Sequence, residues 1–288
     1  MNRNKKKKII LSAVTVILAA LIIWTAWGNT ALELNSYTVS SDRLPEAFDG
    51  YRIAHISDLH NAEMGEDNKK LLTMLQDAEP DIIAITGDLI DSRNTDIEIA
   101  LQFAEEAVKI APCYYVTGNH EARKSEKLYA DFEANLIEAG VVVLHDSEVL
   151  IEHEDANISL IGIDDPNFAE NNGGGVGSSM APDHIGALST NDGFTILLSH
   201  RPEFFDQYVR ADVDLVLCGH AHGGQFRLPF VGGLVAPNQG LFPKYDAGLY
   251  TEENTNMIVS RGIGNSILPF RFNNRPEVIL IELEYQPA

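Results

Sequence analysis

The chain contains only two cysteines in 288 residues, Cys113 and Cys218. Each lies in an apolar, strand-like run before a glycine: Cys113 is five residues before Gly118, and Cys218 is next to Gly219. If both turns lie at one sheet edge, the two cysteines differ by roughly 13 Å in depth along their strands. A disulfide requires Cα atoms within about 7 Å of each other. We therefore expect two buried thiols and no disulfide.

Basic residues are also scarce, with 21 Lys and Arg against 42 Asp and Glu. Five of the basic residues lie in residues 1–28, which contain no acid, so the rest of the chain has 16 basic residues (21 − 5) and a net charge of −26 (16 − 42). Such an acidic body repels nucleic acid and anionic membrane surfaces. No basic patch with interleaved aromatic residues is evident. Nucleic-acid binding is therefore excluded as the main role, and the oligomeric state stays open.

Only one long hydrophobic run is present, the 19 uncharged residues from Ile9 to Trp27. It is enough for roughly 28 Å of helix, the thickness of a bilayer core. Four lysines precede it, which favours a cytoplasmic N-terminus. The run exceeds the usual core of a signal peptide, although Ala26-Trp27-Gly28 is an acceptable cleavage site. We expect a single-pass membrane anchor, or a secreted protein if this segment is cleaved, with the body outside the cytoplasm in either case.

The remaining pattern divides the chain into a linker with a first strand, residues 29–50, and one domain, residues 51–288. Residues 51–57 read as a strand, 68–78 as a helix, and 95–109 as a helix capped by Thr95. This alternation of strands and helices predicts an α/β sheet. The second half is mostly strands with few helices between them. We therefore expect two packed sheets with helices outside.

Metal-capable side chains follow five of the predicted strands. They are Asp58 and His60, then Asp88 and Asp91, then Asn119 and His120, then His200, and finally His220 and His222. Open α/β sheets bind ligands beyond the carboxyl ends of their strands, so these side chains can converge on one place.

Spacing separates the roles of these residues. Asp58 and His60 are two residues apart, as are His220 and His222, and on an extended chain such pairs point the same way. Neighbouring residues such as Asn119 and His120 diverge, so that one can ligate a metal while the other faces a substrate. Mixed Asp, Asn and His ligands suit Mn²⁺, Fe or Zn²⁺. Seven candidate ligands are too many for one ion, and two ions about 3.5–4 Å apart fit them better.

In the order DLH, GDLID, GNHE, SH and GHAH, these motifs resemble those of the calcineurin-like metallophosphoesterases. The stretches PNQGLFPKYDAGLY and RGIGNSILPFRFNNRPEVILIEL are similar to the membrane-associated bacterial YkuE/YaeI-like branch of that family, and the resemblance covers nearly all of residues 35–285. It implies a four-layer αββα sandwich, with two mixed β-sheets flanked by helices. Residues 51–288 would then be the metallophosphoesterase domain.

The resemblance also implies the roles of individual residues. One divalent ion would be held by Asp58, His60, Asp88 and His222, and the second by Asp88, Asn119, His200 and His220, with Asp88 bridging. A phosphodiester or phosphomonoester would be hydrolysed by a metal-bridging hydroxide. His120 would stabilise the transition state or protonate the leaving oxygen. Asp91 would orient one of the metal ligands by a hydrogen bond, or would instead be an acid that caps the helix entry or stabilises the turn. Mn²⁺ is favoured as the metal, with Fe or Zn²⁺ as alternatives.

The substrate is less constrained by the sequence. Lys244, Arg261 and Arg271 are uncommon cations in this acidic body and are candidates to face a substrate phosphate, or to form ion pairs with nearby acids. The loop 232–248, with Asn238, is a candidate wall of the pocket. The phosphate ester could belong to a lipid, a cell-wall polymer or a nucleotide. Alternatives are a pyrophosphate hydrolase of a nucleotide-linked lipid of the UDP-diacylglucosamine type, and a non-catalytic metal-binding surface module.

Overall fold

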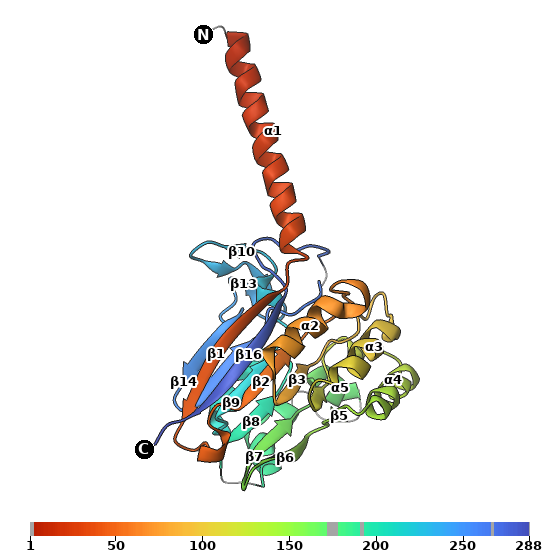
Figure 1. The fold of residues 1–288 in the computed structure, drawn as a ribbon, viewed down its shortest axis with the longest axis vertical. Helices are drawn as coiled ribbons and strands as arrows, with labels where there is room; N and C mark the ends of the chain where they lie inside the picture. The colour runs from red at the N-terminus through yellow and green to blue at the C-terminus, as the bar shows by residue number, and fades with distance from the viewer. Residues whose placement is uncertain (1–2, 172–177, 191–192, 266–267, 288) are drawn as a thin grey trace.

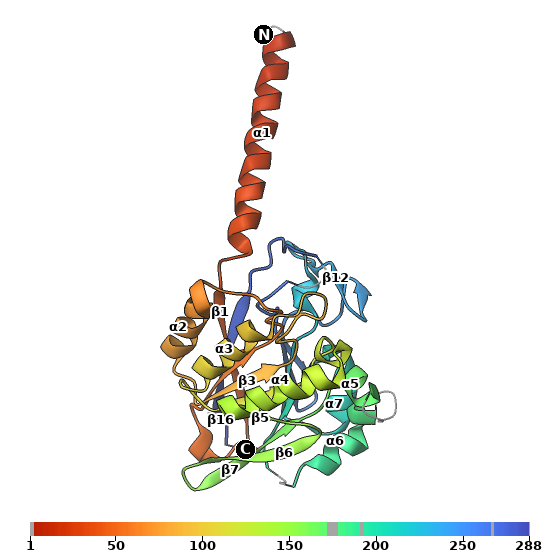
Figure 2. The same ribbon diagram turned by 90° about the vertical axis from the view of Figure 1, so that its right-hand side faces the viewer.

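A long apolar helix projects from one end of the body (Figures 1 and 2). The computed structural model describes residues 3–171, 178–190, 193–265 and 268–287. In it, α1 (Arg3–Gly28) has 26 residues, equivalent to roughly 39 Å of helix. Its most apolar stretch buries none of its surface against the body. The predicted candidate for a membrane span is confirmed as a helix of sufficient length and hydropathy.

The first sheet has six strands in the order β1-β16-β2-β3-β4-β5. Strands β2 to β5 are parallel, while β16 pairs antiparallel with β2 and parallel with β1. The side chains of β3 are buried on both faces, which explains its uninterrupted apolar sequence. The bounds are β1 (Glu33–Ser41), β2 (Arg52–Ile56), β3 (Ile82–Thr86), β4 (Cys113–Val116), β5 (Val142–Val143) and β16 (Glu277–Tyr285).

The second sheet also has six strands, in the order β14-β15-β9-β8-β7-β6. Its four central strands are parallel, and β14 and β6 pair antiparallel at the two edges. The bounds are β6 (Ser147–His153), β7 (Ala156–Gly162), β8 (Thr195–Leu198), β9 (Leu215–Cys218), β14 (Gly248–Glu252) and β15 (Thr255–Val259).

Helices cover the outer face of each sheet. Leu71, Phe103 and Phe132 of α2, α3 and α4 pack with the strand residues Ile83 and Ile85. On the other side, α6 and α7 pack against β7, β8 and β9, and the inner faces of the two sheets share a separate core. The predicted four-layer αββα sandwich is thus confirmed. The helix bounds are α2 (Lys69–Ala78), α3 (Ile97–Ala107), α4 (Glu126–Ala139), α5 (Pro166–Asn171), α6 (Pro182–Leu188) and α7 (Phe205–Arg210).

Two local features differ from the sequence prediction. Helix α3 is capped by Asp96, whose carboxylate accepts a hydrogen bond from the Glu98 amide at 3.2 Å, whereas Thr95 donates to the Asp91 carbonyl. The segment 225–247 contains two short hairpins that the sequence did not reveal. They are β10 (Arg227–Leu228) with β11 (Gly232–Gly233), and β12 (Val235–Ala236) with β13 (Gly240–Leu241).

The two cysteines lie in different sheets, Cys113 in β4 and Cys218 in β9. Both are free and buried, which confirms the expectation of unpaired thiols. Burial raises the pKa of the Cys113 thiol to about 12, so this thiol is inert in the folded protein.

Candidate metal centre

The candidate ligands gather where strands from both sheets end. Asp58 and Asp88 follow β2 and β3 of the first sheet, and His200 and His220 follow β8 and β9 of the second. The His200 ring crosses between the sheets, with Nδ1 2.7 Å from the Thr86 carbonyl oxygen. The structure therefore brings together side chains that are as far as 164 positions apart, from Asp58 to His222.

One cluster consists of Asp58, His60 and His222. The Nε2 atoms of His60 and His222 are 3.2 Å apart. Oδ1 of Asp58 lies 3.2 Å from His222 Nε2 and 3.7 Å from His60 Nε2. All three side chains are buried.

A second cluster consists of Asp88, His200 and His220. Nδ1 of His220 lies 3.2 Å from His200 Nε2, and Asn119 Oδ1 lies 3.3 Å from the same nitrogen. A single oxygen joins the two clusters: Asp88 Oδ2 lies 3.3 Å from His200 Nε2 and 3.5 Å from His60 Nε2. The seven predicted ligands are therefore close enough to share one site.

The backbone at these residues is not extended, which corrects the reasoning from spacing. Five candidate ligands adopt left-handed backbone conformations, namely Asp58 (φ 51°), His60 (φ 47°), Asp88 (φ 52°), His220 (φ 65°) and His222 (φ 48°). Such conformations cost roughly 1–3 kcal/mol each for residues other than glycine and cluster at functional sites. Tight turns, and not the alternation of side chains along a strand, therefore direct these side chains toward the shared site.

Glycines make room for the turns. A Cβ atom on Gly219 would lie 1.8 Å from Ser57 Oγ and 2.4 Å from Asp58 Oδ2. A Cβ atom on Gly118 would lie 2.3 Å from Asp88 Oδ1. At both glycines, the backbone after one strand is therefore in close contact with the aspartate that follows a different strand.

Charge in the site is balanced by the histidines. Burial alone would raise the pKa of Asp58, but the nearby imidazoles, His222 first, hold it well below its usual range. Burial lowers the pKa of His222 to about 3, while for His200 the Asp88 charge overcomes burial and raises the pKa to about 10. Cations entering the site would replace protons on such rings.

The donor set fits divalent ions. Oδ1 of Asp58 is buried and has no hydrogen-bond partner of acceptable geometry among the described residues, although imidazole nitrogens of His60 and His222 lie within 3.7 Å of it. Carboxylate oxygens and imidazole nitrogens that converge in this way are suitable ligands for Mn²⁺, Fe or Zn²⁺. A cation bound there would satisfy a carboxylate oxygen whose burial is otherwise costly.

His120 lies at the edge of the two clusters. Its Nδ1 accepts a hydrogen bond from the Ser92 amide at 2.9 Å, so the neutral ring carries its proton on Nε2. The ring packs edge-on against His60, with centroids 4.3 Å apart. Oδ2 of Asp91 lies 4.0 Å from His60 Nδ1, on the side of the ring away from Asp58, and is also bound to Arg93.

A cavity of about 140 Å³ opens onto these residues. It is lined by Asp88, Asn119, His120, Arg123, Asn167, Arg201, His220, His222, Pro237 and Asn238. The sequence-based inclusion of Asn238 agrees with this lining. Two cations that the sequence analysis missed, Arg123 and Arg201, also line the cavity. They could have been found from their position in the sequence, because each lies one to three residues after a motif histidine.

Arg201 is almost completely buried beside the second cluster. Its guanidinium forms a fork with the Asp165 carboxylate, including a 3.1 Å bond from Nη2, and Nη1 lies 2.9 Å from His220 Nε2. A buried guanidinium with a satisfied carboxylate partner keeps a fixed positive charge at the cavity wall.

The three cations predicted to face a substrate phosphate do not line this cavity. Arg261 is paired with Glu33 and Glu277, and Arg271 donates to the carbonyl oxygens of Arg261 and Gly264. Lys244 is exposed and sits over the Tyr245 ring. Ion pairing, the alternative weighed from sequence, accounts for Arg261, whereas Arg271 binds carbonyl oxygens, a role that the sequence did not suggest.

Glu121 is a structural support that the sequence analysis did not assign. Its buried carboxylate accepts 3.0 Å hydrogen bonds from the amides of both Asp88 and Gly118, and a third from Ile90. It thereby ties the turn after β3 to the turn after β4.

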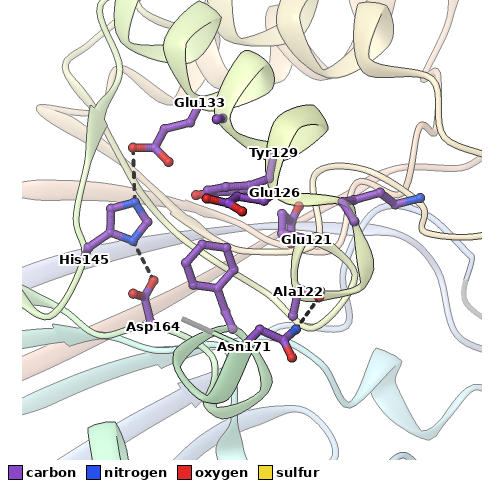
Figure 3. A pocket seen from close by; sticks show the side chains of 11 residues that line it. Glu121, Ala122, Glu126, Tyr129, Glu133, His145, Asp164 and Asn171 are labelled. Atoms are coloured by element: carbon purple, nitrogen blue, oxygen red, sulfur yellow. Dashed lines mark hydrogen bonds and ion pairs between the residues drawn. The ribbon is translucent and has the colours of Figure 1, made fainter. Parts of the chain in front are cut away.

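A larger cavity of about 690 Å³ lies on the other side of the turn Glu121–Arg123 (Figure 3). There His145 bridges two carboxylates, with Nδ1 2.8 Å from Asp164 Oδ1 and Nε2 3.3 Å from Glu133 Oε1. None of the seven predicted metal ligands lines it. The predicted ligands therefore converge beside the smaller cavity and not the larger one.

Comparison with known proteins gives the family. A family model described as calcineurin-like phosphoesterase matches residues 51–224, which contain all seven candidate ligands. The chain belongs to the calcineurin-like phosphoesterase family. It is 30% identical to the uncharacterized metallophosphoesterase YkuE of Bacillus subtilis, over 88% of this chain and 86% of that protein. It is 27% identical to the phosphodiesterase YaeI of Escherichia coli, over 81% and 82%.

A zebrafish (Danio rerio) transmembrane protein with a metallophosphoesterase domain is 31% identical over 84% of this calcineurin-like phosphoesterase and 55% of its own length. The solved structure of the sulfate thiohydrolase SoxB of Thermus thermophilus matches with a TM-score of 0.52 at 11% identity, over 84% of this chain and 57% of that one. That likeness supports the fold alone. The family and the apolar helix together are consistent with a membrane-associated hydrolase of phosphate esters that carries candidate metal-ligand clusters.

Proposed function

We propose that the protein is a dinuclear metal-dependent phosphoesterase that hydrolyses a phosphodiester or phosphomonoester. The observation that carries this proposal is the position of Asp88 Oδ2, within 3.5 Å of an imidazole nitrogen in each of the two clusters. Asp58, His60, Asp88 and His222 would hold one ion, and Asp88, Asn119, His200 and His220 the other. Held by these residues, two divalent ions, with Mn²⁺ favoured, would supply Lewis-acid chemistry, which polarises a phosphate ester and lowers the pKa of water from 15.7 to about 7.

The residues around the ions would then act on the substrate. Arg201 offers a fixed charge at the cavity wall to a phosphate oxygen, and its Asp165 partner holds the guanidinium in place. His120 carries its proton on Nε2 because Nδ1 is occupied by the Ser92 amide. That N–H can donate a hydrogen bond to the leaving oxygen and stabilise the negative charge that develops on it.

We also propose that α1 anchors the protein in a membrane with the body outside the cytoplasm. The exposed apolar surface of α1 and the four lysines before it support this arrangement. A lipid or a cell-wall polymer is then the accessible source of phosphate esters. The intact N-terminus, read by mass spectrometry of the membrane fraction, tests whether α1 is retained or cleaved.

Activity is tested on the full chain in detergent with bis(p-nitrophenyl) phosphate and p-nitrophenyl phosphate, after loading with Mn²⁺. Asp88→Asn keeps the side-chain volume and removes the bridging charge, so we expect metal content and turnover to fall together, with kcat/KM lower by about 10³-fold or more. Asp77→Asn, an exposed acid on α2, is the matched control. Bound metal without turnover in the unmodified protein would instead support a binding module.

A further inference from the structure

The body carries an apolar surface at the end where α1 emerges. We call it the apolar cap and define it as residues 225–247 and 268–270. Of the thirteen large hydrophobic residues exposed beyond α1 in the described chain, eight belong to it. They are Leu228, Phe230, Val231, Val235, Leu241, Phe242, Leu268 and Phe270. Figures 1 and 2 show β10, β12 and β13 of the cap beside the lower end of α1.

The two parts of the cap are joined to each other. Gln225 Nε2 donates to the Leu268 carbonyl at 3.2 Å and to the Phe270 carbonyl at 2.7 Å. The rings of Phe226 and Phe270 pack with centroids 5.4 Å apart. The cap is therefore one connected surface and not a set of scattered side chains, which is the arrangement that marks an interaction site.

The end of α1 is fastened to the same part of the body. Asn29 Nδ2 donates to the Arg271 carbonyl at 2.8 Å, and its Oδ1 accepts from the Arg271 amide at 2.7 Å. Arg275 donates to the carbonyl oxygens of Ala31 and Leu32 at 2.8 Å each, and lies over the Trp27 ring. These contacts set the direction in which α1 leaves the body.

The charge of this region also differs from that of the rest of the body. Residues 225–247 and 262–276 contain four basic residues, Arg227, Lys244, Arg271 and Arg275, and one acid, Asp246. Residues 29–288 as a whole have 42 acids and 16 basic residues. The part of the body nearest α1 therefore lacks the net negative charge that would repel an anionic lipid surface.

We propose that the apolar cap inserts into the surface of the bilayer that α1 crosses, giving the body a second, direct contact with lipid. This rests on the placement of α1 in the membrane proposed above, and not on catalysis. The cap is continuous with α1, and a surface fastened to the end of a spanning helix faces the lipid headgroups. Lipid is therefore what covers the cap. Side chains such as Phe230 and Phe242 would enter roughly 5–10 Å into the boundary between headgroups and acyl chains.

The contact places the metal cavity beside the membrane. Pro237 and Asn238 belong to the cap and line the cavity, and His222 lies three residues before the cap begins. The Leu234 amide of the cap donates to the Gly224 carbonyl at 3.1 Å, which ties the cap to the turn that carries His222. The cap thus forms one wall of the cavity, and a phosphate ester at the lipid surface would reach the ions along it.

The test uses the full chain with a single introduced cysteine, because the two native thiols are buried and do not label. Phe230→Cys and Phe242→Cys place a fluorophore on the cap, and Leu150→Cys places it on β6 at the far end, where the native side chain is also exposed. Each protein is reconstituted into phosphatidylcholine vesicles with or without bromine on the upper acyl chains. We expect brominated lipid to reduce emission at 230 and 242 roughly twofold or more, and to leave 150 unchanged.

Equal emission with and without bromine at 230 and 242 overturns the proposal. If those labels are shielded from aqueous iodide but not quenched by brominated lipid, a protein surface such as a second copy covers the cap, and the proposal is also wrong. Neither readout depends on turnover. An inactive protein with quenched labels would therefore contradict the proposed phosphoesterase activity and would still support the proposed lipid contact.

Discussion

Nε2 of His60 lies 3.2 Å from Nε2 of His222, although 162 residues separate them in the chain. Their rings are nearly parallel, 23° between planes, with centroids 5.0 Å apart. Two imidazole nitrogens this close both point at Oδ1 of Asp58. The arrangement is more easily stabilised by a shared cation than by the rings themselves, which gives the first prediction.

Removing metal should lower the thermal stability of the protein. An ion present at 100 times its Kd contributes about 2.7 kcal/mol to the free energy of unfolding. For a domain of this size that corresponds to a fall in Tm of about 5–10 °C on adding a chelator. Calorimetry with and without chelator measures it, and Asp88→Asn should show a much smaller difference. Equal chelator effects in both proteins would contradict the proposed ligand role of Asp88.

Replacing His120 should impair stabilisation of the leaving oxygen more than metal binding. We expect His120→Asn to lower kcat by about 10²–10³-fold on an ester whose leaving group is a poorly acidic alcohol. The loss should be smaller with a p-nitrophenolate leaving group, which spreads its negative charge over the ring. Metal content, measured by mass spectrometry, should stay at the unmodified level. A loss that is the same for both leaving groups would argue against a contact between His120 and the leaving oxygen.

Gly219→Ala should disturb the first cluster, because the added Cβ would overlap Ser57 and Asp58. Overpacking of this kind costs about 1–3 kcal/mol in the free energy of unfolding. Metal affinity should fall with it, since Asp58 must move. Gly186→Ala on α6 is the matched control, because nothing lies within 4 Å of its added Cβ. Replacing an exposed helical glycine by alanine should leave the stability of the protein unchanged or raise it slightly. Unchanged metal binding in Gly219→Ala would show that metal affinity does not depend on the position of the Asp58 carboxylate.

Arg201→Met should destabilise the fold by about 3–5 kcal/mol, because it leaves the buried Asp165 carboxylate without its partner. Arg201→Lys keeps the charge but not the fork of donors. We therefore expect Arg201→Lys to remain folded while its KM for phosphate esters rises. Urea unfolding and steady-state kinetics separate the two effects. A lysine variant with unchanged KM would place the substrate phosphate elsewhere in the cavity.

His145 should make stability depend on pH. Burial lowers its pKa, but the carboxylates of Asp164 and Glu133 overcome burial and raise it from 6.5 to about 9. The stabilisation is therefore fully present below about pH 6.5 and is lost as the pH rises through 9. His145→Gln should lower the free energy of unfolding at pH 6 and approach the unmodified protein at pH 10, as measured with urea. A difference that is constant with pH would show that packing alone accounts for the effect.

Much of the site could be predicted because its chemistry is local to short motifs. Each motif follows a buried apolar strand, and the parallel strand ends bring the motifs together without further information. The predicted extended backbone was nevertheless wrong, since five of the seven candidate ligands have left-handed backbone conformations. Backbone conformation at such turns depends on contacts across strands, for example the hydrogen bonds that Glu121 accepts from the turns after β3 and β4.

Charged residues outside the motifs were harder to place. Arg201 and Arg271 have the same side chain, yet Arg201 lines the cavity and Arg271 is buried and donates to the Gly264 carbonyl. Arg201 binds Asp165, which is 36 positions earlier in the chain, and Arg271 binds carbonyl oxygens of an irregular segment, so spacing in the sequence predicts neither contact. The hairpins of the apolar cap were missed for a similar reason, because strands of two residues leave no periodic pattern.

The position of β16 has a consequence for how the protein is made. The last strand of the chain lies between β1 and β2, which are among the first to leave the ribosome. Until residues 277–285 are synthesised, both early strands keep an open edge, so the first sheet cannot close during translation. The helix at residues 3–28 is available long before. Membrane targeting through this helix can therefore precede folding of the first sheet.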